Sequence, residues 1–189
     1  MKNHLASFAF FIISITAGYA QTTSVEESIF SAQTGFLGMY FNHELRLTNK
    51  IALRSEVGLD AGFWGSDVND INGYLLAPVF TLEPRWYYNL KKRTNKGKRI
   101  ANNTGNFVSI KTSYHPDWFT ITNADHLNFI GDFTIIPTWG IRRHIGNHFN
   151  YETGIGLGYG RYITTKEDYY YGDKNVLAAN LHLRIGYTF

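Results

Sequence analysis

The sequence predicts an all-β fold, an antiparallel up-and-down transmembrane β-barrel of about eight strands. Three observations predict it. Apolar and polar residues alternate with a period of two along most of the chain after residue 35, aromatic residues gather near the ends of these segments, and short turns alternate with long polar connections. No stretch after residue 20 is long and apolar enough for a transmembrane helix, so a chain that enters a membrane must do so as a closed barrel.

The first twenty residues are expected to be an export signal and not part of the fold. Lys2 gives a positive start, the apolar stretch Leu5–Ala17 follows, and Gly18-Tyr19-Ala20 fits the small-x-small rule for a cleavage site. The stretch is shorter than the roughly 20 residues that a membrane anchor needs, which disfavours that alternative. We therefore expect a cleaved signal peptide, 1–20, and one barrel domain, 21–189. The chain has no cysteine, which excludes a lipid-anchored lipoprotein and a disulfide scaffold.

The first expected strand is inferred from parity. Apolar residues occupy the odd positions of Phe36–Leu45 up to Phe41, which marks this segment as a strand. Because single-chain bacterial barrels have even strand numbers, another strand must precede it. We place that strand at about Val25–Gln33, with a turn near Thr34-Gly35.

The clearest alternation lies in Ile51–Trp64, Phe149–Tyr162 and Leu177–Phe189, where most odd positions are apolar and the even ones are charged, polar or small. A soluble β-sandwich would also alternate. A membrane barrel is favoured because the polar face mixes both charge signs with many glycines, as a packed lumen would, and because aromatic residues mark the strand ends. The other expected strands are Tyr74–Tyr88, Asn106–Trp118 and Phe133–Ile145.

The connections set the topology. The turns at Arg46–Lys50 and Gly146-Asn147 are short, and membrane barrels place such turns on the periplasmic side with their long loops outside. The tip Tyr169–Tyr171 of one long loop is expected to lie against lipopolysaccharide or to touch a glycan or a partner protein. The basic segment Asn89–Gly105 is an exception, a long connection on the periplasmic side. We expect a solvated, mobile loop there, with contact to lipid phosphates or cell-wall polymer as the alternative.

The terminal sequence Leu183–Phe189, together with the signal peptide and the alternating strands, resembles the small outer-membrane β-barrel proteins of Gram-negative bacteria. The stretch from Glu44–Leu47 to Leu53–Leu59 is similar to the first periplasmic hairpin of the Bacteroidota versions. The resemblance implies a location in the bacterial outer membrane and recognition of Tyr187 and Phe189 by the barrel-assembly machinery. It carries over no catalytic residues, since the family includes structural proteins, adhesins and small transporters.

An eight-stranded barrel has an interior just wide enough for side chains to fill, and buried charges must be paired. We therefore expect a salt-bridged interior. Across the two short turns, Asn42 is expected opposite Arg54, and Arg142 opposite Asn150 and diagonal to Glu152. The expected interior charge network consists of Glu44, Arg54, Glu56, Asp60, Glu83, Arg85, Lys111, His115, Arg142, Glu152, His182 and Arg184.

The function that follows is a structural or loop-mediated interaction role for a barrel with a filled polar interior. A narrow conduit for small or apolar solutes is the alternative, and a lipid-modifying enzyme is disfavoured because the one candidate pair, His43 and Ser55, has no acid beside it. We expect no enzyme activity, no cofactor and no metal. The expected partners are outer-membrane lipid, lipopolysaccharide and the assembly machinery, with the protein a monomer. The net charge of +3 is too mild to suggest nucleic acid.

Overall fold

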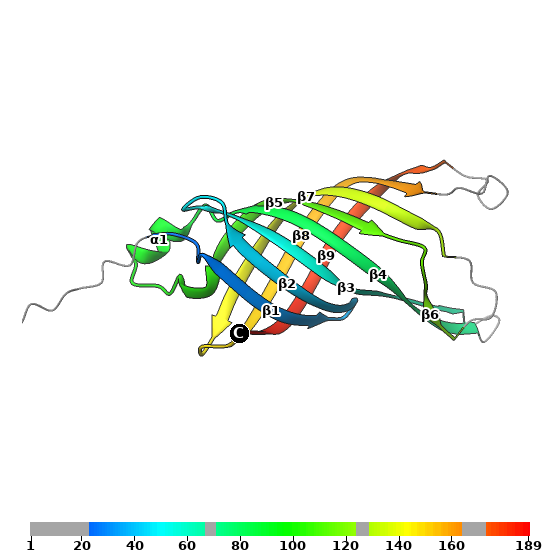
Figure 1. Ribbon diagram of the computed structural model, residues 1–189, viewed down its shortest axis with the longest axis horizontal. Coiled ribbons are helices and arrows are strands. Elements are labelled where there is room, and N and C mark those ends of the chain that lie inside the picture. The colour runs from blue at the N-terminus through cyan, green and yellow to red at the C-terminus, as the bar shows by residue number, and fades with distance from the viewer. Residues whose placement is uncertain (1–22, 67–70, 124–128, 164–172) are drawn as a thin grey trace, which may run out of the picture.

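In the computed structural model the chain is described over residues 23–66, 71–123, 129–163 and 173–189. The expected signal peptide, 1–20, and the loop tip 169–171 lie outside these ranges. The described part is all-β, and eight long antiparallel strands close it into one barrel (Figure 1), which confirms the expected antiparallel barrel of about eight strands. The long strands are β1 (Ser28–Gly35), β2 (Gly38–Arg46), β3 (Ile51–Ser66), β4 (Ile71–Trp86), β5 (Gly105–His115), β7 (Gly131–Ile145), β8 (Phe149–Ile163) and β9 (Asn175–Thr188).

The first and last strands close the barrel. β1 pairs with β2 on one side and with β9 on the other, where Ser31 faces Thr188. The strand that parity requires is therefore present, although it begins at Ser28 and not at Val25, and the two-residue turn Phe36-Leu37 follows it. The short strand β6 (Ile121–Thr122) adds to the edge of β4 beyond the end of β5.

The start of β2 requires a glycine. Gly38 has a φ of 139°, a conformation that side-chain-bearing residues rarely adopt. A Cβ atom at this position would lie 2.1 Å from the carbonyl oxygen of Leu59 and 2.8 Å from the hydroxyl of Tyr40. The tight turn thus presses the beginning of β2 against β3, and only the missing side chain allows this approach.

The β2–β3 hairpin is paired two residues away from the expected register. Asn42 faces Glu56, so the expected pairing of Asn42 with Arg54 is wrong. The reason is a wider loop, in which the backbone N–H groups of Leu47 and Thr48 both donate to the carbonyl oxygen of Ile51. Because the shift is an even number of residues, every side chain stays on its expected face of the sheet.

The β7–β8 hairpin shows the same shift. Arg142 faces Glu152 directly, and the expected pairing of Arg142 with Asn150 is wrong. Ile145 pairs with Phe149, so the loop is 146–148, and Gly146 turns the chain with a φ of 62°. This register brings the two residues into direct opposition, although the guanidinium group of Arg142 donates to Glu44 and Ser31 and not to Glu152.

The basic segment between β4 and β5 folds over one end of the barrel, which we call the closed end (Figure 1). It contains α1 (Leu90–Thr94) and the short 3-10 helix η1 (Ala101–Asn103). The expectation of a mobile loop is therefore wrong: the segment is a folded cap, although Lys91, Lys92, Lys96 and Lys98 remain exposed. Its apolar side chains pack against the barrel in a buried cluster of Val25, Ala52, Tyr87, Leu90, Ile100 and Phe107.

Hydrogen bonds fix this cap to two parts of the barrel. The backbone N–H of Asn102 donates to Glu26 Oε1 over 3.0 Å, and the backbone N–H of Glu26 donates to Asn103 Oδ1 over 2.8 Å. Arg99 donates to the carbonyl oxygen of Gly146 in the β7–β8 turn. The cap is thus hydrogen-bonded both to the segment that leads into β1 and to the turn between β7 and β8.

Apolar side chains cover the outside of the barrel, and polar side chains fill much of its inside. Leu181 and Leu157 on the outer surface are 71% and 64% exposed, whereas Arg54 inside is fully buried. This distribution is the reverse of the usual one, in which charged residues are almost never fully buried. Among the described residues, no helix is long and apolar enough to cross a membrane.

Candidate functional site

The half of the interior near the closed end holds a layer of paired charges, which we call the charge layer. Alternation along β2, β3, β4, β7, β8 and β9 points these side chains inward, and each is at most 5% exposed. Equal numbers of carboxylates and guanidinium groups make the layer formally neutral. Its members are Glu44, Glu56, Glu83, Glu152, Arg54, Arg85, Arg142 and Arg184.

Glu44 connects the charge layer to the cap. Its Oε1 accepts hydrogen bonds from Arg142 and, over 3.3 Å, from Nη1 of Arg85. Its Oε2 accepts from the hydroxyl of Tyr87 over 3.0 Å and from Nδ2 of Asn103 over 2.8 Å. Burial, and then the neighbouring Glu44 carboxylate, raise the pKa of the Tyr87 hydroxyl, which therefore stays protonated as a donor.

Glu152 is the second centre of the layer. Arg85 binds it in a bidentate manner, with Nη2 at 2.7 Å from Oε1 and Nη1 at 2.8 Å from Oε2. Nη1 of Arg54 lies 3.2 Å from Oε2, and Nε2 of His182 lies 3.4 Å from Oε1. Arg85 also donates to Glu83 over 2.7 Å. Bidentate arginine–carboxylate pairs are strong and directional, so these contacts hold β3, β4 and β8 together across the lumen.

Glu56 extends the layer toward the opposite end of the barrel. Nε of Arg54 donates to it over 3.0 Å, and Nη1 of Arg184 approaches its two oxygens at 2.8 and 3.0 Å. The guanidinium group of Arg184 also lies over the ring of Tyr40, 3.6 Å from its centroid. The ring thus covers a face of the guanidinium group while its edge donates to the carboxylate.

The charge layer and the cap together close this half of the barrel. Arg54, Arg85 and Arg142 are at most 1% exposed, so no water-sized space reaches them. Each is held against carboxylates, as buried charges must be, because an isolated one costs several kcal/mol. The lumen at this level is therefore filled with side chains, which is the interior that the sequence predicts.

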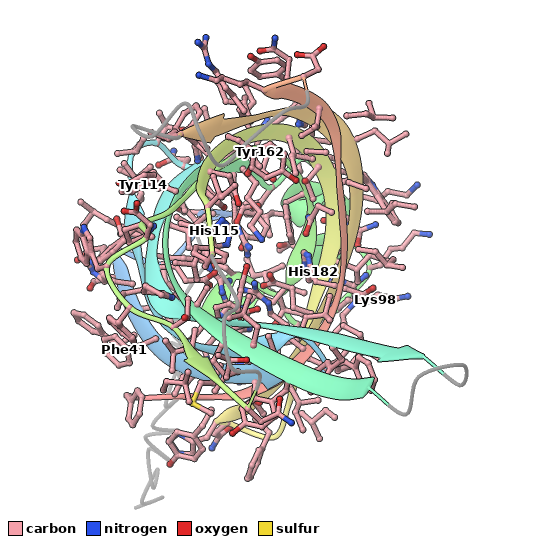
Figure 2. The ribbon with its side chains drawn as sticks, turned by 90° about the vertical axis from the view of Figure 1, so that its right-hand side faces the viewer. Phe41, Lys98, Tyr114, His115, Tyr162 and His182 are labelled. Atoms are coloured by element: carbon pink, nitrogen blue, oxygen red, sulfur yellow. The ribbon has the colours of Figure 1, made fainter. Side chains whose placement is uncertain are left out.

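A different cluster lies toward the opposite end, which we call the open end. Nε2 of His115 is 2.9 Å from Asp60 Oδ2, and Nδ1 of His115 is 3.0 Å from Asp132 Oδ1. The imidazole thus bridges β3 and β7 from β5. Figure 2, which looks along the barrel from this end, shows His115 and His182 inside the ring of strands and Phe41 outside it.

Between the charge layer and this histidine cluster lies a cavity of about 340 Å³, which we call the vestibule. One wall is polar and the other is largely apolar. Five of the expected interior residues border it: Asp60, Lys111, His115, His182 and Arg184. The structure thus divides the expected network into a dense charge layer and a hollow upper part. Its lining includes the charged or titratable residues Asp60, Lys111, His115 and Arg184 and the apolar residues Ile136, Val176 and Ala178.

Sequence reasoning missed several polar partners. Asp132 immediately precedes the expected strand Phe133–Ile145, in which the even positions point inward. Starting this strand one residue earlier would have predicted an inward side chain for Asp132. Ser109 donates to Glu83 over 2.6 Å and was recognisable only as one of many inward serines. Tyr87 has the same parity as Glu83 and Arg85 in the expected strand Tyr74–Tyr88, so alternation could have assigned it to the interior, whereas Asn103 belongs to the cap, where no periodicity signals direction.

The pair His43 and Ser55 lies on the outer surface of the barrel. The two residues face each other across β2 and β3, but Nε2 of His43 is hydrogen-bonded to Ser28 Oγ at 2.9 Å. The imidazole stacks on the ring of Phe30, with centroids 4.3 Å apart. His43 and Ser55 border an open apolar hollow of about 510 Å³ that also touches Phe41. The structure places no carboxylate with this histidine, among the residues it describes.

The C-terminal aromatic residues also lie on the outer surface. Tyr187 and Phe189 have ring centroids 5.4 Å apart, and Tyr187 meets Phe149 edge-on at 5.7 Å. The backbone N–H of Phe189 donates to the carbonyl oxygen of Phe30 over 3.0 Å. The end of the chain is therefore part of the barrel wall at the β1–β9 closure.

In the described ranges, no group of three or more histidine, cysteine, aspartate or glutamate side chains is arranged to hold a metal ion. Comparisons with protein-family models, with curated proteins and with solved structures find no match to this chain. A proposal about function must therefore rest on the geometry of the barrel itself.

Proposed function

We propose that the mature chain is an integral outer-membrane β-barrel with a sealed polar interior, which supports the membrane or presents its loops to partners. The observation that carries this proposal is the reversed distribution of side chains, with leucines exposed outside and arginines buried inside. In water such an outer surface would be a large apolar patch, far beyond the few hundred Å² that soluble monomers expose. In a bilayer the same surface is matched to its solvent.

Aromatic side chains at both ends of the barrel support the membrane location. Near the closed end, Trp139 Nε1 donates to the hydroxyl of Tyr88 over 2.9 Å, and Trp86 meets Tyr88 edge-on at 6.0 Å. Near the open end, Phe80 meets Trp118 at 5.6 Å. Two such girdles are typical of membrane barrels, because tyrosine and tryptophan are favoured where lipid meets water.

The filled charge layer favours a sealed barrel over the conduit, which is the second function the sequence allows. The vestibule is hollow, but it ends at Arg184 and Glu56, below which the lumen is packed. We propose that the protein is not an enzyme, since His43 is engaged by Ser28 and the pair with Ser55 has no orienting acid. Outer-membrane lipid and lipopolysaccharide would surround a monomer, and Tyr187 and Phe189 would be the signal that the assembly machinery recognises.

Cell fractionation tests the location. The processed chain is expected in the outer-membrane fraction, resistant to extraction by carbonate or urea, and it should migrate differently in gels before and after heating. A processed chain that stays soluble without detergent and keeps its strands would overturn the proposal.

Planar-bilayer recording tests the seal separately. The purified protein is expected to show at most tiny, rare openings, because the charge layer leaves no passage. A steady nanosiemens conductance would refute the sealed interior and support the conduit, while leaving the membrane location intact.

A further inference from the structure

We propose that the vestibule is a binding site for a small amphipathic molecule that carries one anionic group, such as a carboxylate, on an apolar body. Lys111 would bind the anionic group, and the wall formed by β7 and β9 would hold the apolar body. This inference goes beyond a sealed barrel, since it assigns a ligand to a large hollow inside the described part of the lumen.

The ammonium group of Lys111 is the first observation. Lys111 projects from β5 into the barrel and borders the vestibule, yet it has no hydrogen bond to, and no ion pair with, any residue that the structure describes. An ammonium group has three donors, and leaving them unused inside a protein is costly. A bound anion would satisfy this group.

Most of the other charged side chains around the vestibule contact a charged partner, and Arg161, which contacts none within the described residues, is exposed. Asp60 and Asp132 both contact the imidazole of His115, at 2.9 and 3.0 Å. Arg184 is paired with Glu56 at 2.8 Å. Within the described residues, the two charged side chains at the vestibule that have no ion pair, Lys111 and Arg161, are both positive, which favours an anion over a cation.

The apolar wall gives the second half of the chemistry. Ile136 of β7 is the register partner of Lys111 and lies beside it, and Val176 and Ala178 of β9 border the vestibule two strands further round the barrel. A purely polar anion would leave this wall in contact with water, whereas an apolar body covers it and gains about 25 cal/mol for each Å² removed from water. Ligand sites commonly combine an apolar lining with a few placed polar groups.

The size and position of the vestibule define the kind of molecule. A volume of about 340 Å³ equals the space of roughly ten liquid waters, which suits a molecule of one or two rings or a medium-length chain. The charge layer forms its floor, so a ligand cannot leave through the closed end. The site would therefore hold its ligand and not pass it through the barrel.

Binding is tested with the folded protein in lipid nanodiscs and two probes of matched shape, the carboxylate 1-naphthoate and the neutral 1-naphthalenemethanol. Isothermal titration calorimetry, with empty nanodiscs as the blank, should show saturable binding of 1-naphthoate to one site. The neutral probe should bind at least ten-fold more weakly, because it lacks the charge that would pair with Lys111.

Three variants locate the site. Lys111→Met should lower the affinity for 1-naphthoate at least ten-fold and remove the preference over the neutral probe. Lys98→Met, which changes an exposed lysine in the cap at the other end, should leave both affinities unchanged. Ala178→Phe fills the vestibule from the opposite wall and should abolish binding of both probes.

Three outcomes would overturn the proposal: no saturable binding by the wild-type protein, undiminished binding by Lys111→Met, or undiminished binding by Ala178→Phe. Competition by inorganic sulfate as strong as that by 1-naphthoate would show a bare-anion site and refute the apolar half of the inference. Should Lys111→Met fail to fold, Lys111→Gln and Ala178→Phe carry the test. Because the assay measures binding and not membrane insertion or conductance, a negative result leaves the proposed function standing.

Discussion

The charge layer makes a quantitative prediction for Glu56→Gln. The substitution keeps the size of the side chain but removes the carboxylate that pairs with Arg184 at 2.8 Å, and it gives the neutral layer a net positive charge. Breaking a buried ion pair on one side costs about 3–5 kcal/mol, because the partner charge stays buried. Two unit charges about 4 Å apart at an effective dielectric constant of about 20 interact by a similar amount, about 4 kcal/mol.

Reversible denaturant unfolding in lipid vesicles, followed by tryptophan fluorescence, measures this cost. The free energy of unfolding of Glu56→Gln should fall by about 3–5 kcal/mol. The double variant Glu56→Gln/Arg184→Met restores neutrality and should recover much of the loss, since buried pairs can often be replaced by apolar groups without penalty.

The matched control is Glu27→Gln. Glu27 pairs with Arg46 at 2.7 Å, but its side chain is 89% exposed, so its loss should cost less than about 1 kcal/mol. If Glu56→Gln is no more destabilising than Glu27→Gln, the charges inside the barrel are solvated and the argument for a dry, filled layer is wrong.

Three further substitutions test other parts of the structure in the same unfolding assay. Leu157→Arg, on the outer surface of β8, should lower the free energy of unfolding by about 2–4 kcal/mol if that surface meets lipid. Leu47→Arg, in a turn, should lower it hardly at all, and equally small effects of both substitutions would argue against a membrane location. Gly38→Ala should cost about 1–3 kcal/mol, since φ is 139° and the Cβ would lie 2.1 Å from a carbonyl oxygen, and a neutral result would contradict the tight turn. Tyr87→Phe should cost about 1.5–3 kcal/mol by removing a donor to Glu44, and an unchanged free energy of unfolding would mean that the cap contributes little through this bond.

The direction of each interior side chain was predictable because a strand alternates strictly between two faces. Glu152 and Arg184 could be assigned to the interior from their even positions alone, and the structure places them there. The two-residue errors in hairpin register did not disturb this assignment, because only a shift by an odd number reverses the faces. Alternation therefore predicts which residues are inside, even where it does not predict what each one faces.

The partners within the lumen were not predictable in the same way. Arg142 donates to Glu44 although the two residues lie on β7 and β2, strands that are not neighbours in the barrel. Such contacts depend on how far each strand is displaced along its neighbour around the whole barrel, a quantity that no single hairpin reveals. The cap was missed for a different reason: its charged residues Lys91, Lys92 and Arg93 hide the short apolar pattern, with Leu90 and Ile100, that buries it.

The sequence of β8 explains why the barrel is filled at one level and hollow at the next. Glu152 contributes a large side chain to the charge layer, and the inward positions that follow it are Gly154, Gly156, Gly158 and Gly160. At Gly158 a Cβ would lie 2.2 Å from the carbonyl oxygen of Ile135, so the close approach of β7 forbids a side chain there. These four glycines thus give β8 no side chain to project into the lumen at this level. Ala178 and Lys111 are not glycines and carry side chains at their positions. A larger residue at 178 would fill the vestibule, and an apolar residue at 111 would remove its positive charge. The chemistry of the cavity therefore depends on Ala178 of β9 and Lys111 of β5. Substitutions at these two positions test whether the cavity binds a ligand or is only an incidental space between the strands.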